Sequence, residues 1–158
     1  MNPWPCFSKA KDEKYHLLEC SAERNLHPKN KSLNRMKNDI KHKADIETFV
    51  NGFYDKVRRD DMLAPVFASR IADAAWPEHL QRMYAFWNAI LFAETGFRGN
   101  PMQKHLSLPV GTKHFDRWLL LFQQTIDENF SGPKAEEAKL RAGSIAGIMN
   151  FKIETLRK

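Results

Sequence analysis

DIETFVNGFYDKV, the stretch at residues 45–57, repeats its apolar residues with the period of an α-helix. The apolar positions are spaced three and four residues apart, so they share one helix face. They are Ile46, Phe49, Val50, Phe53, Tyr54 and Val57. Gly52 interrupts the pattern, and we expect a joint there between a short helix and a second one. The stretch therefore predicts helical structure with one face in a hydrophobic core.

The same period continues along the chain. Pro77 suits the first turn of a helix, and this helix is expected to run to about Thr95, where Gly96 would stop it. Later helices are expected at residues 101–105, 115–130 and 133–156. No segment alternates with period two, and no Asn-Gly or Asp-Gly turn joins strand-like runs. The sequence predicts an all-α fold of five or six helices.

The first 44 residues differ in composition from the rest. They are polar, with Asn-Pro, Trp-Pro and His-Pro dipeptides and a run of Lys and Asn. We expect residues 1–44 to form a poorly ordered extension and residues 45–158 to form one folded domain. Met36 could equally be the first residue of the protein.

Composition and the lengths of the apolar runs indicate the cellular compartment and the partners of the protein. The longest apolar runs, residues 89–93 and 118–122, are far shorter than a membrane-spanning helix, and the N-terminus has no apolar stretch typical of a secretory signal. Cys6 and Cys20 both lie in the extension, where we expect reduced, structurally idle thiols. The net charge of +6 is a mild excess spread over the surface. We expect a cytoplasmic protein that binds neither membrane nor nucleic acid.

The chemistry centres on His105, in the sequence NPMQKHLSLP at residues 100–109. A short helix with proline at both ends holds one imidazole rigidly, as a haem iron requires of its protein ligand. The other ring nitrogen is expected to donate to a backbone carbonyl one turn earlier. An ordinary histidine at a helix end is the alternative that these residues leave open.

Further polar and aromatic residues fit a pocket for a flat cofactor. His79 precedes His105 by 26 positions, on a separate helix that could face it. Tyr54 and Trp118 lie on apolar helix faces, so their OH and NH groups need partners and would suit a ligand that gains negative charge. Aromatic residues recur in four predicted helices or their joints, which is also typical of an ordinary core.

Other chemistries have less support. The chain has no glycine-rich phosphate loop and no Cys-x-x-Cys motif, so zinc knuckles and covalent haem attachment are not supported. The histidines at 79, 105 and 114 lack the spacing of a helical zinc site.

Several blocks together resemble the group III truncated haemoglobins. They are FYDKVRRD at 53–60, LAPVF at 63–67, WPEHL at 76–80, FW at 86–87, GNPMQKHL at 99–106 and HFDRWLLLF at 114–122. They follow one another in the family's order and cover about residues 45–155. The resemblance implies an all-α, truncated globin-like helical sandwich, two helices over two, around a haem b (iron protoporphyrin IX).

The resemblance also implies a role for individual residues. His105 would be the iron ligand, with Tyr54, His79 and Trp118 on the distal side, where a gas binds. The haem would contact Phe67, Met83, Phe86 and Phe115, while Arg82 and Lys104 would pair with its propionates. The family does not need an extension such as residues 1–40.

We therefore expect oxygen binding or transport, with nitric oxide, carbon monoxide or cyanide as further ligands. The alternative is a haem enzyme with peroxidase-like or nitric-oxide-detoxifying activity, which would need a reductase as partner. A cofactor-free helical interaction module is the remaining alternative, and a protein that takes up no haemin would favour it.

Overall fold

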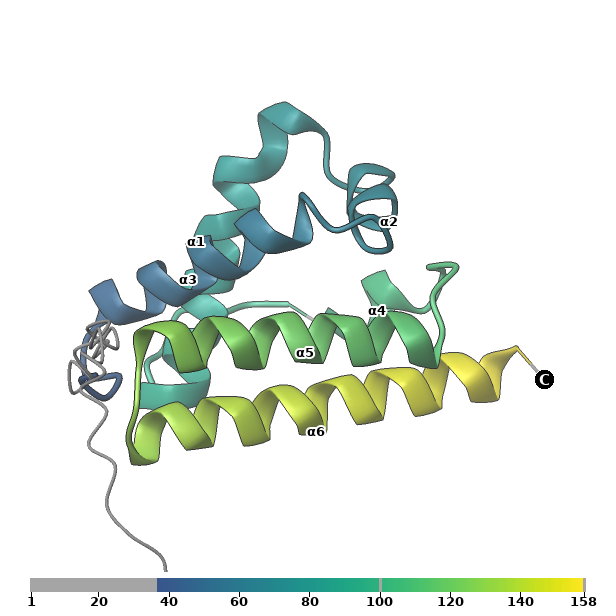
Figure 1. Ribbon diagram of the computed structural model, residues 1–158. Coiled ribbons are helices and arrows are strands. Elements are labelled where there is room, and N and C mark those ends of the chain that lie inside the picture. The colour runs from purple at the N-terminus through teal and green to yellow at the C-terminus, as the bar shows by residue number, and fades with distance from the viewer. Residues whose placement is uncertain (1–36, 100, 158) are drawn as a thin grey trace, which may run out of the picture. The chain divides into compact units, whose positions relative to one another are not determined.

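The computed structural model describes residues 37–99 and 101–157 (Figure 1). These residues form six α-helices and one 3₁₀-helix, and no strand occurs among them. The elements are α1 (Lys43–Val57), α2 (Ala64–Ala68), η1 (Asp73–Ala75), α3 (Trp76–Phe92), α4 (Pro101–His105), α5 (Thr112–Asn129) and α6 (Pro133–Leu156). The predicted all-α class is confirmed.

The long helices form two layers. Helices α5 and α6 run side by side along their length, and α1 and α3 form the layer that lies across them (Figure 1). Helix α1 packs on α5, α3 packs on α6, and the short α4 contacts α6. This is the two-over-two sandwich that the family resemblance implies.

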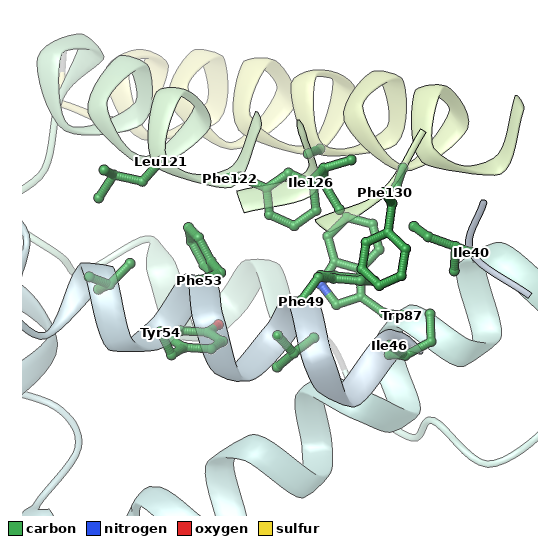
Figure 2. Close-up of a cluster of buried hydrophobic side chains, with 14 of the residues drawn as sticks. Ile40, Ile46, Phe49, Phe53, Tyr54, Trp87, Leu121, Phe122, Ile126 and Phe130 are labelled. Carbon is green, nitrogen blue, oxygen red and sulfur yellow. The ribbon is translucent and has the colours of Figure 1, made fainter. Parts of the chain in front are cut away.

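Aromatic side chains fill the space between the layers (Figure 2). Phe49 of α1 meets Trp87 of α3 and Phe122 of α5 edge to face, each at 5.7 Å between ring centroids. Trp87 and Phe122 stack on each other at 4.8 Å. Because edge-to-face and offset stacked pairs are the favoured aromatic arrangements, these three rings hold three helices together. The six apolar positions predicted for residues 45–57 are all buried.

Gly52 does not divide the first helix, so the predicted joint is wrong. Helix α1 is continuous from residue 43 to 57. A Cβ atom on Gly52 would lie 3.4 Å from Cγ2 of the buried Thr125 on α5. Gly52 therefore lies where α1 and α5 approach closely, since a Cβ there would already be in van der Waals contact with α5.

Helix α3 ends earlier than the sequence predicts. Its last residue is Phe92, and Ala93 follows in the left-handed conformation with φ 53°, which commonly ends a helix. The side-chain amine of Lys134, on α6, donates to the carbonyl oxygen of Leu91 at 3.0 Å. This contact from a distant helix satisfies a last-turn carbonyl, and nothing near Thr95 in sequence indicates it.

The folded region begins before Asp45, so the expected boundary at residue 44 is too late. Ile40 is only 2% exposed and belongs to the core, and α1 begins at Lys43. Asp39 binds the start of α6, where its carboxylate accepts the backbone N–H groups of Lys134 and Ala135 at 2.9 and 2.8 Å. The expectation for residues 1–36 lies outside the described residues.

We expect Asp39→Ala to lower the free energy of unfolding by about 1–2 kcal/mol, as removal of a helix N-cap does. Partial burial raises the pKa of Asp39, but the N–H groups of Lys134, Ala135 and Ile40 outweigh it and hold the pKa below its usual value. The stabilisation is therefore present above the unfolded-state pKa of about 3.9 and lost as the pH falls through the lowered native value. Urea unfolding at several pH values measures this difference.

The control for this prediction is Asp55→Ala, which removes an exposed carboxylate from α1. A variant at Asp39 that unfolds like this control at neutral pH would contradict the prediction. Gly132 matters to the same contact, because its φ is +146° and a Cβ there would come within 2.5 Å of Cγ of Asp39.

Helix α6 buries one face and leaves another exposed. The buried residues are Ala135, Ala138, Ala142, Ala146, Met149 and Ile153. Ile148 and Leu156 of the same helix are 53% and 66% exposed. They lie off the narrow, alanine-rich face that contacts the neighbouring helices. None of the helices in the described part of the chain has the length and apolar character needed to cross a membrane.

Candidate haem pocket

A cavity opens between the two layers beside the aromatic core. The empty space there is about 940 Å³, which includes open solvent at the mouth of the cavity. Side chains from α1, α2, α3, α5 and α6, and from the segment at residues 105–110, line it. Most of these side chains are apolar, as a large flat cofactor requires.

His105 is in the wall of this cavity and is half-buried. It is the last residue of α4, and Leu108 and Val110 of the following turn also line the cavity. The backbone N–H of Leu108 donates to the carbonyl oxygen of His105 at 3.0 Å. The predicted short helix thus brings the imidazole to the cavity and a tight turn follows it.

His79 lies in the first turn of α3 and lines the same cavity. Its Nε2 atom is buried and has no hydrogen-bond partner within residues 37–99 and 101–157. Burial lowers the pKa of His79 to about 4, with smaller contributions from Arg82 and His105, so the imidazole is neutral at pH 7. A buried polar atom without a partner is costly, and a ligand in the cavity would relieve that cost.

Tyr54 packs against His79 at 5.0 Å between ring centroids, edge to face. Its side chain is 7% exposed, and burial raises the pKa of the phenol above its usual value. The hydroxyl therefore keeps its proton at neutral pH and can act as a hydrogen-bond donor. Trp76 contacts both rings, at 5.7 Å from Tyr54 and 5.5 Å from His79.

The other predicted pocket residues divide into two groups. Five line the cavity with the histidines and Tyr54, namely Phe67, Met83, Phe86, Phe115 and Trp118. Arg82 and Lys104 are not among the lining residues and are exposed. Arg82 pairs with Glu78 on its own helix, at 3.0 Å. Their pairing with propionates stays a prediction.

Nine lining residues were not predicted as site residues. They are Leu63, Val66, Trp87, Leu108, Val110, His114, Ile145, Ala146 and Met149. Ile145 and Met149 carry the apolar period of α6, which does not distinguish a pocket wall from a core. His114 lacks the spacing of a helical zinc site, and none of the described residues form a group of three or more potential metal ligands.

An ion pair fixes the turn between α1 and the cavity wall. Asp60, which is 8% exposed, accepts the backbone N–H groups of Met62 and Leu63, both at 3.1 Å. Arg117 of α5 donates its Nε–H to the same carboxylate at 2.6 Å. Leu63 lines the cavity, and Arg117 directly precedes Trp118, which also lines it. The ion pair therefore fixes the positions of these two parts of the cavity wall relative to each other.

We expect Asp60→Ala to lower the free energy of unfolding by about 1–3 kcal/mol, because it leaves several donors unsatisfied. Burial raises the pKa of Asp60, but Arg117 and the two backbone N–H groups outweigh it and keep the pKa low. The stabilisation is thus lost only as the pH falls below about 4.

Urea unfolding of Asp60→Ala, Arg117→Ala and the double variant measures the coupling between the two residues. We expect the double variant to lose less stability than the sum of the single variants. Asp61→Ala, at an exposed neighbouring carboxylate, is the control. Strictly additive losses would show that the pair contributes no coupling.

Comparison with known proteins agrees with this fold and cavity. A family model described as a bacterial-like globin matches residues 36–149. The group 3 truncated hemoglobin ctb of Campylobacter jejuni is 35% identical over 95 residues, which cover 58% of this chain and 75% of that protein. The crystal structure of group III truncated hemoglobin from Campylobacter jejuni matches with a TM-score of 0.69 and 30% identity, over 75% of this chain and 95% of that one.

Two helical layers around a histidine-bearing apolar cavity, together with these matches, define a haem-binding globin. The chain belongs to the bacterial-like globin family, and within it to the group III truncated haemoglobins. The family takes small gaseous ligands such as oxygen, as the resemblance of the sequence motifs implied.

Proposed function

We propose that the cavity holds a haem b, with His105 as its protein ligand and the gas-binding side formed by Tyr54, His79 and Trp118. The observation that carries the proposal is the unpartnered Nε2 of His79, buried in the wall of a cavity that His105 also lines. Because such an atom lacks a partner among the residues that the structure describes, it fits a site built for a polar ligand. The mainly apolar remainder of the wall fits a macrocycle.

The residues that line the cavity also fit a haem. A histidine nitrogen is a common protein ligand to haem iron, and the iron supplies the position at which a diatomic gas binds. Phe67, Met83, Phe86 and Phe115 come from three different helices and the cavity lies between them. They would hold the macrocycle and exclude water from both faces.

The polar residues would select the gas. Tyr54 is protonated and buried, and Trp118 carries an indole N–H, so both can donate to a ligand that gains negative charge. Such donors favour oxygen over neutral ligands. Nitric oxide, carbon monoxide and cyanide are small enough for the same cavity and are the further ligands that we propose.

The absorption spectrum of the purified protein tests this proposal. We expect it to take up one haemin per chain, to show an intense Soret band, and to shift that band when the reduced protein meets carbon monoxide. A colourless protein that takes up no added haemin would overturn the proposal.

A further inference from the structure

His114 is a polar residue of the cavity wall to which the proposed function gives no role. It lies in the first turn of α5 and is half-buried. It lines the same cavity as His79 and His105. A polar side chain at a mainly apolar cofactor site usually orients the ligand.

The contacts of His114 fix its tautomer. The backbone N–H of Gly111 donates to Nδ1 of His114 at 3.3 Å. A neutral imidazole has one acceptor nitrogen and one donor nitrogen, so this contact leaves the proton on Nε2. Within residues 37–99 and 101–157 no protein acceptor is hydrogen-bonded to that Nε2. His114 thus presents a donor at the cavity.

We propose that His114 binds a carboxylate of the haem, donating its Nε2–H to one propionate. The inference rests on the proposed function. A carboxylate held against a protein needs a hydrogen-bond donor. The two basic residues predicted to bind the propionates, Arg82 and Lys104, do not line the cavity. Arg82 pairs with Glu78 instead, and Lys104 is exposed.

The proposed function already gives a role to the other polar side chains of the wall. His79 and Tyr54 pack together with Trp76, and His105 is the proposed iron ligand. His114 belongs to α5, the layer opposite α3, so it approaches the cavity from a different side than His79. At this position, away from His79, His114 can bind at the edge of the macrocycle, to which the carboxylates are attached.

The test compares haem with its dimethyl ester, in which both propionates are masked. Wild type and His114→Ala are each loaded with either porphyrin, and the loss of porphyrin to an excess of a haem-scavenging apoprotein is timed. Because a hydrogen bond to a charged group is stronger than one between neutral groups, we expect His114→Ala to lose haem about tenfold faster. We expect both proteins to lose the ester at the same rate, because the interaction needs both partners.

A second variant separates this role from the capping of α5. His114→Glu keeps an acceptor for the Gly111 N–H, since glutamate is the preferred residue at that position of a capping box, but it has no donor and adds a negative charge. We expect unchanged helix content by circular dichroism, and haem loss at least as fast as that of His114→Ala. Lys113→Ala, at the exposed neighbouring residue, is the control and should lose haem at the wild-type rate.

Two results would overturn the inference alone. One is an equal acceleration of haem and ester loss in His114→Ala, which would mean that the imidazole supports the macrocycle or the fold. The other is wild-type haem retention in His114→Glu, which would mean that His114 only caps α5. A wild-type protein that takes up neither porphyrin would overturn the proposed function, and this inference with it.

Discussion

His105→Ala is expected to abolish stable haem retention, the largest single effect that we predict. Loss of a residue that only orients a metal ligand typically costs about 10–100-fold in affinity, so loss of the ligand itself should cost more than about a hundredfold. His105 ends a short helix in the wall of the cavity, and no other residue of α4 is a histidine. Haemin titration followed by absorption spectroscopy measures the change.

Added imidazole offers a positive test of the same assignment. The truncated side chain leaves room beside the iron, and free imidazole can enter it and restore haem binding. His42→Ala is the matched control, because His42 is exposed at the start of α1 and does not line the cavity. If His105→Ala kept a normal Soret band and normal gas affinity, the iron ligand would be another residue, with His79 and His114 as the histidines that line the cavity.

Tyr54→Phe and Trp118→Phe are each expected to raise the oxygen off-rate about ten- to a hundredfold. This range follows from about 1.5–3 kcal/mol for a hydrogen bond to a charged group. Oxygen becomes partly anionic when a ferrous haem binds it, whereas carbon monoxide stays nearly neutral, so the effect on carbon monoxide should be much smaller. Stopped-flow measurement of both gases provides the comparison.

The two substitutions should couple if both donors reach the same ligand. Tyr54 and Trp118 each contact Phe53, at 4.9 and 5.2 Å between ring centroids, so a shared neighbour also links them. A double variant with a smaller effect than the product of the single effects is therefore expected. His79→Leu should change the on-rate more than the off-rate. Equal effects on oxygen and carbon monoxide would show that these side chains act through cavity shape, and the electrostatic explanation would be wrong.

Local periodicity was enough to predict the helices, whereas most of the candidate site residues came from the family resemblance. All six predicted apolar positions of α1 are buried, because a single face of that helix meets the core. Likewise, eight of the ten predicted site residues line the cavity, since the motifs that carry the family resemblance lie on the elements around it.

Features that depend on distant residues could not be predicted in the same way. The end of α3 at Phe92 depends on Lys134 of α6, and the place of Ile40 in the core depends on helices that follow it. The wall that α6 contributes, at Ile145, Ala146 and Met149, has the same apolar pattern as a core helix. The spacing of apolar residues therefore predicts which face of each helix is buried. It does not predict which other elements that face packs against, because this depends on the tertiary fold.

The contact between Asp39 and α6 has a consequence for biosynthesis. It joins residues 95 and 96 positions apart, and such non-local contacts form late because a long loop must close first. A ribosome that has made α1 to α5 has thus released neither the partner of Asp39 nor the last wall of the cavity. We expect the nascent chain to stay incompletely packed until α6 emerges, so that haem insertion follows the emergence of this helix.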